Sequence, residues 1–337
     1  MNAVILSGGF GTRLDPLTRD IIKPMLTVAG KPTIDYAVSH LADFGISDYV
    51  FTLAHKPEQV IEWAVGYRDA ACRFSLETEP LGTAGGVKAA EKFLDDTFIV
   101  MSGDALENID LAAMYARHRL RGSLVTMAVK REDDTSRFGV VETDAFGTAV
   151  NFVEKPPRGT AKSDLVSCGV YIIEKSLLSL VPQNRAFDFA RDLFPKIIDF
   201  GLIGTYLHEG YWRDVGDVNA YYSANFDMLG GGFFVPLYNN FRGAYSSYRV
   251  GKSSVSLIGA SSFAAGTFEN CIIGQNCRIE RGAALENCLV TDGAIVSGRY
   301  RGAIIGRDYV KQIEPPPSGQ YSGVDTGYER FFASIEY

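Results

Sequence analysis

Short apolar runs alternate with helix-like patterns in the first part of this chain, and this alternation limits its fold more than any other feature. The strand-like runs are 3–6, 49–53, 98–101 and 124–129. Between and after them lie segments with a helical spacing of apolar residues, around 34–44, 57–67, 86–93 and 111–121. Because parallel neighbours need crossovers of this length, the alternation predicts an α/β fold with a mainly parallel sheet covered on both faces. The segment 140–173 is more strand-like, which predicts an antiparallel excursion from that sheet.

Glycine-bearing turns follow two of the expected strands. Residues 7–13 read Ser-Gly-Gly-Phe-Gly-Thr-Arg, and residues 102–104 read Ser-Gly-Asp. Ligands of parallel sheets bind beyond the carboxyl ends of strands, so we expect both turns to face one crevice. The amide groups of a glycine-rich turn suit a phosphate, and Arg13 and Lys23 add positive charge. No Gly-Lys-Ser/Thr closes a P-loop, and Leu14 stands where a dinucleotide-binding turn needs its third glycine.

A six-residue period replaces this pattern after the run Gly230-Gly231-Gly232. One stripe consists of Ile273, Ile279 and Leu285, and the other consists of Cys271, Cys277, Ala283, Leu289 and Ile295. The period predicts a short left-handed β-helix in which each hexapeptide forms one face of a triangular coil. A run of irregular β-hairpins is the alternative. The expected organisation is an α/β domain over 1–232, the β-helix over 233–312 and a C-terminal tail over 313–337.

Composition excludes several classes of protein. The chain has 33 Lys and Arg residues against 40 Asp and Glu residues, a net charge of −7, and no block of basic residues. We therefore expect no nucleic-acid partner and no membrane partner. The start lacks the basic region of a signal peptide, and no apolar run is long enough to span a bilayer, so a cytoplasmic protein is expected. The five cysteines form no Cys-x-x-Cys pair and the four histidines are scattered, which disfavours a zinc or redox site.

A set of longer motifs carries a resemblance to a known family. The first is Gly-Gly-Phe-Gly-Thr-Arg-Leu-Asp-Pro-Leu-Thr at 8–18, followed by Lys-Pro-Met at 23–25. Further motifs follow in the family's order at 79–85, 102–104, 138–141, 153–156, 168–171 and 210–216. Together they resemble the sugar-1-phosphate nucleotidyltransferases, and within that family they are most similar to the mannose-1-phosphate guanylyltransferases. The resemblance covers the first two-thirds of the chain and implies a Rossmann-like nucleotidyltransferase domain over 1–232.

The resemblance implies attack by a sugar-1-phosphate oxygen on the α-phosphorus of a nucleoside triphosphate, with pyrophosphate leaving. Such chemistry depends on positioning and charge neutralisation, and a hard divalent cation held by carboxylates is the usual device. Asp104 and Asp214 are the implied Mg²⁺ ligands, although by spacing alone each could be a helix cap or a turn residue. The implied catalytic residues are Arg13, Lys23 and Asp104, with the two cations gripping the triphosphate. Asp217 adds a carboxylate that could support the metal site or cap the next helix.

Two further groups of residues are implied to bind the substrates. The nucleotide-binding residues are Leu6, Gly8, Gly9, Gly11, Thr12, Glu77, Gly82 and Gly85. The residues that bind the sugar phosphate are Gly139, Glu154, Lys155, Ser167 and Gly169. A carboxylate such as Glu77 can accept hydrogen bonds from the N1–H and N2–H₂ edge of guanine, which favours GTP. Glu77 could equally be a solvated residue at a strand edge.

Departures from the family's pattern leave alternatives open. Ile22 stands where the family commonly has proline, and Ser167 where it often has asparagine. The expected substrates are GTP and mannose-1-phosphate; the alternatives are another base or sugar, such as glucose-1-phosphate or a heptose phosphate, and a non-catalytic regulatory subunit that binds a nucleotide-sugar. A homo-oligomer is expected, with the β-helix as the candidate contact.

Overall fold

The computed structural model describes residues 1–67, 70–229, 245–250 and 254–313. Contacts divide the chain into two units. The first comprises Met1–Phe10, Ile22–Met25 and Thr33–Asp214, and the second comprises Gly11–Ile21, Leu26–Pro32 and Val215–Tyr337. The predicted domain boundary at 232 and nearly all of the predicted tail lie outside the described residues.

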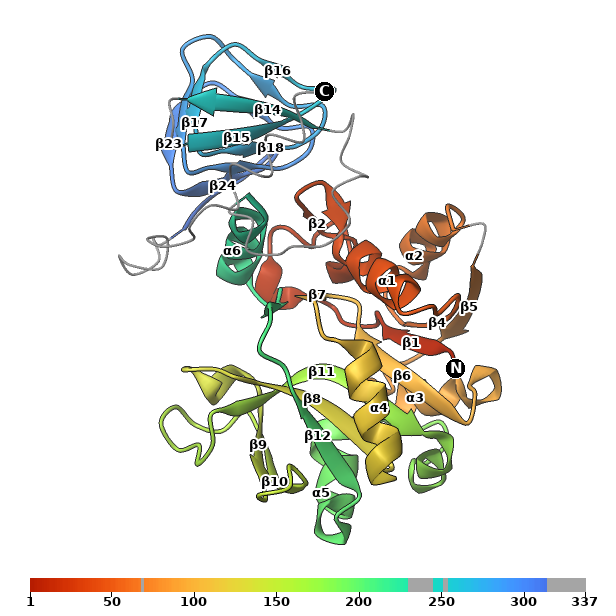
Figure 1. Ribbon diagram of the computed structural model, residues 1–337. Helices are drawn as coiled ribbons and strands as arrows, with labels where there is room; N and C mark the ends of the chain where they lie inside the picture. Colours follow the sequence, from red (N-terminus) through yellow and green to blue (C-terminus); the bar gives the residue numbers. More distant parts are fainter. Residues whose placement is uncertain (68–69, 230–244, 251–253, 314–337) are drawn as a thin grey trace. The chain divides into compact units, whose positions relative to one another are not determined.

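Parallel strands form one half of a sheet in the first unit (Figure 1). In spatial order they are β6 (Thr97–Ser102), β1 (Ala3–Leu6), β4 (Asp48–Leu53) and β5 (Ala71–Leu76). The helices in this part of the chain are α1 (Thr33–Asp43), α2 (Pro57–Ala64), α3 (Gly82–Ala89) and α4 (Leu111–Arg121). The predicted mainly parallel α/β architecture is therefore confirmed, although the sequence analysis did not identify β5 as a strand.

Helices cover both faces of this sheet, as the burial of β1 shows. Val4 packs in a cluster that includes residues of α3, whereas Ala3 and Ile5 pack in a second cluster with residues of α1, α2 and α4. Side chains of successive strand residues point to opposite faces, so the two clusters lie on the two sides of the sheet. The predicted helix at 86–93 differs from the structure, because α3 begins at Gly82, ends at Ala89 and is followed by the separate 3₁₀ turn Glu91–Phe93.

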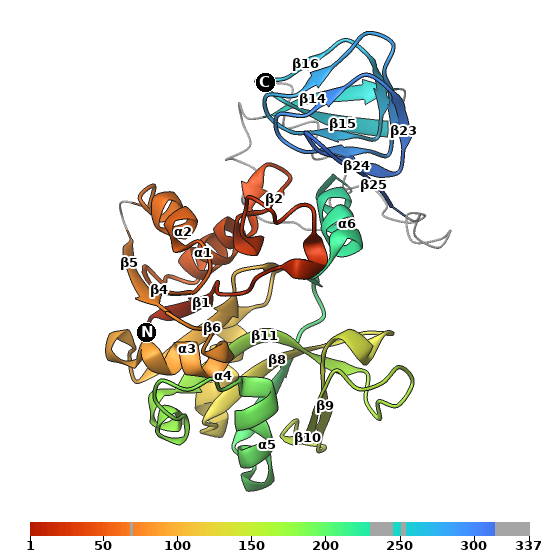
Figure 2. The same cartoon turned by 180° about the vertical axis from the view of Figure 1, so that it is seen from behind.

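The other half of the sheet contains the predicted antiparallel excursion. This half of the sheet comprises β8 (Val125–Arg131), β9 (Gly139–Thr143), β10 (Ala149–Glu154), β11 (Leu165–Glu174) and β12 (Ile203–Leu207). Strand β11 is antiparallel to both β6 and β8, and β12 is parallel to β8. Strand β8, which contains most of the predicted strand at 124–129, is separated from β6 by β11. The β9–β10 hairpin continues from the edge of β11 (Figure 2).

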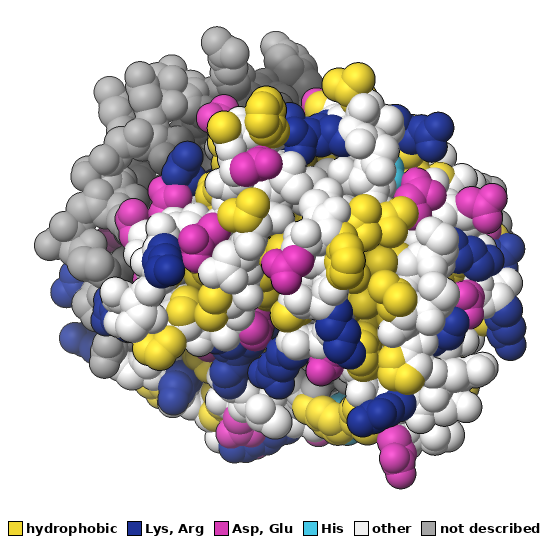
Figure 3. Space-filling view, turned by 90° about the horizontal axis from the view of Figure 1, so that it is seen from below, with side chains coloured by type: hydrophobic (Ala, Val, Ile, Leu, Met, Phe, Trp, Pro, Cys, Tyr) yellow, Lys and Arg dark blue, Asp and Glu magenta, His cyan; other side chains and the backbone are white. Residues whose placement is uncertain are grey.

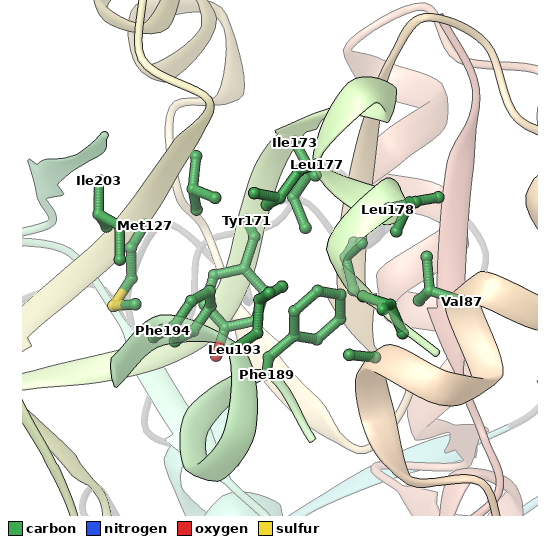
Figure 4. Packing of buried hydrophobic residues seen from close by; sticks show 14 of the residues in the cluster. Val87, Met127, Tyr171, Ile173, Leu177, Leu178, Phe189, Leu193, Phe194 and Ile203 are labelled. Carbon is green, nitrogen blue, oxygen red and sulfur yellow. The ribbon is translucent and has the colours of Figure 1, made fainter. Parts of the chain in front are cut away.

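Aromatic rings fill the core on the α3 face of the sheet. Phe194 from α5 (Phe194–Ile197) lies 5.3 Å from Tyr171 and 5.7 Å from Phe189, measured between ring centroids. Figure 4 shows these rings together with Leu177 and Leu178. This packing holds β11 against the helical segments that follow it.

The second unit contains a coil of short parallel strands. Three sheets form its faces: β15 (Ser254–Gly259), β18 (Ile272–Ile273), β21 (Leu289–Val290) and β24 (Ala303–Ile305); β16 (Phe263–Ala264), β19 (Arg278–Ile279) and β22 (Ile295–Val296); and β17 (Thr267–Glu269), β20 (Ala284–Glu286) and β23 (Arg299–Arg301). The predicted short β-helix is therefore confirmed. Two antiparallel strands flank the first sheet, β14 (Tyr245–Val250) beside β15 and β25 (Val310–Gln312) beside β24.

The six-residue period holds only in part. Ile273, Ile279 and Leu285 are buried, but Ile295 is 67% exposed and Val296 is buried in its place. The reason is the length of the coils: Ile272 pairs with Leu289, 17 residues later, and Leu289 pairs with Ile304, 15 residues later. Coils built from three strict hexapeptides would all have the same length. Because the observed coils differ in length, the stripe of inward-facing residues shifts by one position after Leu285.

Helix α6 (Val218–Leu229) joins the parts of the second unit. The hairpin of β2 (Thr27–Val28) and β3 (Lys31–Pro32) is bound through Asn225, whose Oδ1 accepts the Ala29 N–H at 2.9 Å. On the β-helix side, the Tyr222 hydroxyl donates to the Asn287 carbonyl at 2.7 Å. The helix thus contacts both the hairpin and the β-helix.

Charge is mixed on the face of the molecule that Figure 3 shows. Basic and acidic side chains are interspersed among hydrophobic ones across the face shown in Figure 3. Within the described parts of the chain, none of the helices combines the length and the apolar character needed to cross a bilayer.

Candidate active site

The two aspartates predicted to bind a metal come from neighbouring strands. Asp104 directly precedes β7 (Ala105–Glu107), which pairs antiparallel with β13 (Trp212–Asp214). In this register Asp214 lies opposite Ala105, so its carboxylate is brought to the side of Asp104. Since Asp104 follows β6, the pair lies at the carboxyl end of a central strand, where ligands of such sheets bind.

Lys23 lies against both carboxylates. Its Nζ is 2.5 Å from Asp104 Oδ2 and 3.2 Å from Asp214 Oδ1. The Ser102 hydroxyl adds a hydrogen bond of 2.6 Å to the other oxygen of Asp104. The structure therefore brings together three residues that are far apart in the sequence.

Electrostatics keep this cluster charged although Lys23 is buried and the two aspartates are partly buried. Burial by itself lowers the pKa of Lys23, but Asp104 and Asp214 outweigh it and raise that pKa above its ordinary value. Burial also favours protonation of Asp104, and the Lys23 ammonium reverses this and holds the pKa of Asp104 below its usual range. Two carboxylates and one ammonium leave a net negative charge, which attracts a cation.

The alternative roles of the aspartates are now distinguished. Asp104 begins no helix, because β7 follows it, and α4 is capped by Asp110, whose carboxylate accepts the Ala113 N–H at 2.9 Å. Asp217 does cap a helix, since its Oδ1 accepts the Ala220 N–H in the first turn of α6 at 2.8 Å. The helix-cap interpretation therefore fits Asp217 and does not fit Asp104.

The two carboxylates offer the donor set that Mg²⁺ prefers. Magnesium is typically held by one or two carboxylates, with phosphate oxygens and water completing its shell. Asp104 and Asp214 already share one cation, the Lys23 ammonium, which shows that both oxygens face the same positive charge. Among the residues that the structure describes, no group of three or more His, Cys, Asp and Glu side chains could hold a metal ion without substrate oxygens.

Thr33 was not predicted to contribute to the site. Its buried hydroxyl lies 3.0 Å from the Pro24 carbonyl and 3.1 Å from the Gly103 carbonyl. It therefore connects the turn that carries Lys23 to the turn that carries Asp104. Nothing in the spacing of the sequence pointed to Thr33, because its partners come from two distant segments.

Residues predicted to contact the base lie at the ends of β1 and β5. Leu6 is the last residue of β1, and Glu77 follows β5. A Cβ placed on Gly8 would lie 3.9 Å from Glu77 Oε1, so these two residues are neighbours, whereas Gly9 has open space around it. Glu77 Oε2 accepts the Leu81 N–H at 2.8 Å. Burial raises the pKa of Glu77, and the Leu81 hydrogen bond opposes this shift.

Gly82 and Gly85 have a structural reason to lack side chains. A Cβ on Gly82 would lie 2.8 Å from the Phe187 carbonyl, and one on Gly85 would lie 2.7 Å from the Arg185 carbonyl. The Gly85 N–H also donates to the Phe187 carbonyl at 2.9 Å. The two glycines thus allow the backbone around 185–187 to pack on the start of α3.

The predicted residues Gly11, Thr12 and Arg13 belong to the second unit. Gly11 has a positive φ of 64°, and its carbonyl accepts hydrogen bonds from the Leu14 N–H at 2.9 Å and the Thr18 hydroxyl at 3.0 Å. These bonds close the 3₁₀ turn Thr12–Leu14. Arg13 is therefore carried by a defined turn.

Glu154 and Lys155 lie together at the end of β10. Lys155 Nζ is 3.1 Å from Glu154 Oε1, and the Lys155 N–H donates to the Phe138 carbonyl at 3.0 Å. Gly139 makes room for the Phe152 ring, which a Cβ would overlap. The pair of charged side chains is thus held on the hairpin beside the sheet.

Ser167 and Gly169 lie where β11 departs from regular pairing. The register between β11 and β8 shifts between Ser167 and Tyr171, and Gly169 there has a φ of 73°. Ser167 Oγ lies 3.0 Å from the Tyr171 hydroxyl and accepts the Gly169 N–H at 3.3 Å. Such an irregularity bends the strand locally and re-aims its side chains.

Comparison with known proteins identifies the family. The family model described as "Nucleotidyl transferase" matches residues 2–230. The chain belongs to this family. The predicted enzyme class, a sugar-1-phosphate nucleotidyltransferase, is confirmed with it.

Relatives of this nucleotidyltransferase carry two different substrate names. A mannose-1-phosphate guanylyltransferase of Mycobacterium tuberculosis is 32% identical, over 91% of this chain and 83% of that protein. A UTP–glucose-1-phosphate uridylyltransferase of Synechocystis sp. is also 32% identical, over 66% of this chain, which spans 62% of that relative's length. The crystal structure of HddC from Yersinia pseudotuberculosis complexed with GMP-PN matches with a TM-score of 0.59 and 29% identity, covering 67% of this chain and 99% of HddC.

Proposed function

We propose that this nucleotidyltransferase makes GDP-mannose and pyrophosphate from GTP and mannose-1-phosphate. The observation that carries the proposal is the contact of Lys23 with Asp104 and Asp214 at the carboxyl end of β6. The name of the Mycobacterium tuberculosis relative, which matches 91% of this chain, supports mannose-1-phosphate as the acceptor. The GMP-PN bound to HddC supports a guanine nucleotide.

The chemistry requires alignment of two phosphates. An oxygen of the sugar phosphate forms a bond to the α-phosphorus, and the bond from that phosphorus to the oxygen bridging to the β-phosphate breaks. The attacking oxygen is already ionised, so no general base is needed. Asp104 and Asp214 would hold Mg²⁺, which supplies positive charge to the phosphate oxygens when bound. Lys23 binds the triphosphate, and Lys155 binds the phosphate of the sugar. For Arg13, a role at the triphosphate stays a prediction from the sequence.

Neighbouring carboxylates orient the two substrates. Glu154 accepts hydrogen bonds from sugar hydroxyls beside Lys155, with which it pairs at 3.1 Å. For the base, the relevant carboxylate is Glu77. One of its oxygens accepts the Leu81 N–H, and the second oxygen lies near Gly8. That second oxygen can accept from the donor edge of guanine, which uracil does not present.

A second substrate pair has specific support. The Synechocystis relative named for UTP and glucose-1-phosphate has the same identity as the mannose-1-phosphate relative, over a shorter part of the chain. The same residues would then perform the same transfer with another base and sugar.

Pyrophosphate release across a grid of nucleoside triphosphates and hexose-1-phosphates, with Mg²⁺, tests the proposal. Turnover limited to GTP and mannose-1-phosphate is the expected result, and it should vanish when a chelator removes the cation. Turnover with UTP and glucose-1-phosphate alone would replace the substrates and keep the chemistry. If the protein binds a nucleotide-sugar but turns over no substrate pair, the proposed catalytic activity would be contradicted and a regulatory subunit would be favoured.

A further inference from the structure

A side chain from α2 holds the start of the turn that carries Lys23. The Ile22 N–H donates to Gln59 Oε1 at 2.9 Å, although the two residues are 37 positions apart. Gln59 lies in the first turn of α2, and Ile22 is 2% exposed. A buried backbone N–H therefore receives its acceptor from a distant element.

This hydrogen bond acts on the backbone next to Lys23. The Ile22 carbonyl accepts the Met25 N–H at 2.9 Å, so Ile22 begins the 3₁₀ turn Lys23–Met25. On the other side of Lys23, the Pro24 carbonyl is bound by Thr33. The turn is thus fixed both before and after the lysine, by α2 and by α1.

A buried N–H without a partner costs free energy, so loss of the acceptor would favour movement of Ile22 toward water. Lys23 would move with it, because the two residues are adjacent. The distances of 2.5 and 3.2 Å to the two carboxylates leave little room for such movement. A proline at position 22 would fix the backbone through its ring and would need no acceptor, whereas Ile22 needs one.

We propose that Gln59 is a positioning residue for nucleotidyl transfer. By binding the Ile22 N–H, Gln59 sets the backbone position from which Lys23 reaches Asp104, Asp214 and the triphosphate. The inference rests on the proposed function of Lys23. Gln59 acts through Ile22 and need not contact either substrate.

Three variants of α2 test the role. Gln59→Leu keeps the approximate size of the side chain and removes the acceptor, whereas Gln59→Glu keeps an acceptor oxygen. Glu62→Leu, on an exposed position of the same helix, is the matched control. We expect Gln59→Leu to lower kcat/KM for the nucleoside triphosphate roughly tenfold, the effect of one lost hydrogen bond. The other two variants should behave like wild type.

The Michaelis constants separate positioning from simple loss of folded protein. Displacement of Lys23 should raise KM for the nucleoside triphosphate and leave KM for the sugar phosphate unchanged. Loss of folded protein would lower the apparent kcat and leave both KM values unchanged, and that result for Gln59→Leu would overturn the proposal. Equal kinetics of Gln59→Leu and wild type would overturn it as well.

Hydrogen exchange of the Ile22 amide gives a readout that needs no turnover. We expect faster exchange in Gln59→Leu than in wild type, with Gln59→Glu and Glu62→Leu unchanged. Unchanged exchange in Gln59→Leu would show that Gln59 does not protect this amide and would overturn the proposal. Inactive wild-type protein with the expected exchange pattern would instead contradict the proposed function and keep the hydrogen bond.

Discussion

The carboxylate site and the β-helix obtain their order in opposite ways. Lys23, Asp104 and Asp214 meet from three distant segments, and their cluster depends on charge and hydrogen bonds. In the β-helix each strand pairs with strands 15 or 17 residues away, and apolar side chains such as Ile279 fill the interior. The first region is therefore sensitive to single polar groups, whereas the second is sensitive to buried volume.

The largest effect should come from the carboxylate site. Asp104→Asn removes one charge from the expected cation site, and we expect kcat to fall about 10³-fold while the protein stays folded. The matched control is Asp110→Asn at the cap of α4, because asparagine caps a helix as well as aspartate. Steady-state pyrophosphate release and circular dichroism of both variants make the comparison. Near-wild-type turnover of Asp104→Asn would remove this residue from the chemistry.

A smaller effect, on stability, should separate two isoleucines of the β-helix. Ile279 is fully buried and Ile295 is 67% exposed, although the strict six-residue period places both inside. Ile279→Ala should destabilise the protein by about 2–5 kcal/mol, the usual cost of removing such a side chain from a core. Ile295→Ala should change the free energy of unfolding by less than about 0.5 kcal/mol. Equal effects in urea denaturation would contradict the observed coil lengths.

A buried carboxyl group beside the site should give a pH-dependent effect. Burial raises the pKa of Glu107 above the ordinary 4.5, against the opposing effects of His40 and the Ile109 N–H. A carboxyl group whose pKa is raised in the folded protein favours folding below its unfolded pKa, and this stabilisation is lost as pH rises through the folded pKa. In Glu107→Gln, the free energy of unfolding should therefore decrease less than in wild type as the pH rises above 4.5. Parallel slopes of unfolding free energy against pH for variant and wild type would contradict this.

The smallest effect should come from an ion pair on the outside of the β-helix. Arg301 lies 3.1 Å from Glu286; the arginine side chain is largely exposed to solvent and the glutamate is half-buried. Arg301→Ala should change the free energy of unfolding by less than about 1 kcal/mol, because solvent screens such pairs. A larger loss in urea denaturation would show that this outer face contributes to stability as the core does.

The sequence was informative where structure is local or periodic. The strand at 3–6, the helix at 111–121 and the β-helix expected from the stripe of Ile273, Ile279 and Leu285 agree with the structure, because each follows from spacing within one segment. Thr33 and Gln59 were not predicted, because their hydrogen bonds join segments that only the fold brings together.

The insertion of β11 between β6 and β8 was not predicted for a related reason. An apolar strand can pair in either direction, and nothing in residues 165–174 specifies its neighbours. The shift of the β-helix stripe after Leu285 likewise depends on corners of unequal length. For the candidate site, residue types and strand ends could be predicted from the sequence, whereas the contact of Lys23 with both carboxylates depends on the pairing of β7 with β13.

The antiparallel strands β14 and β25 have a consequence for how far this coil can grow. They form the two outer edges of the sheet β14-β15-β18-β21-β24-β25. A parallel edge strand would present a template on which the first coil of another molecule could continue the same winding. In the part of the chain that the structure describes, a reversed strand at each edge breaks that winding, so another molecule could not extend the coil on this face by the same parallel pairing.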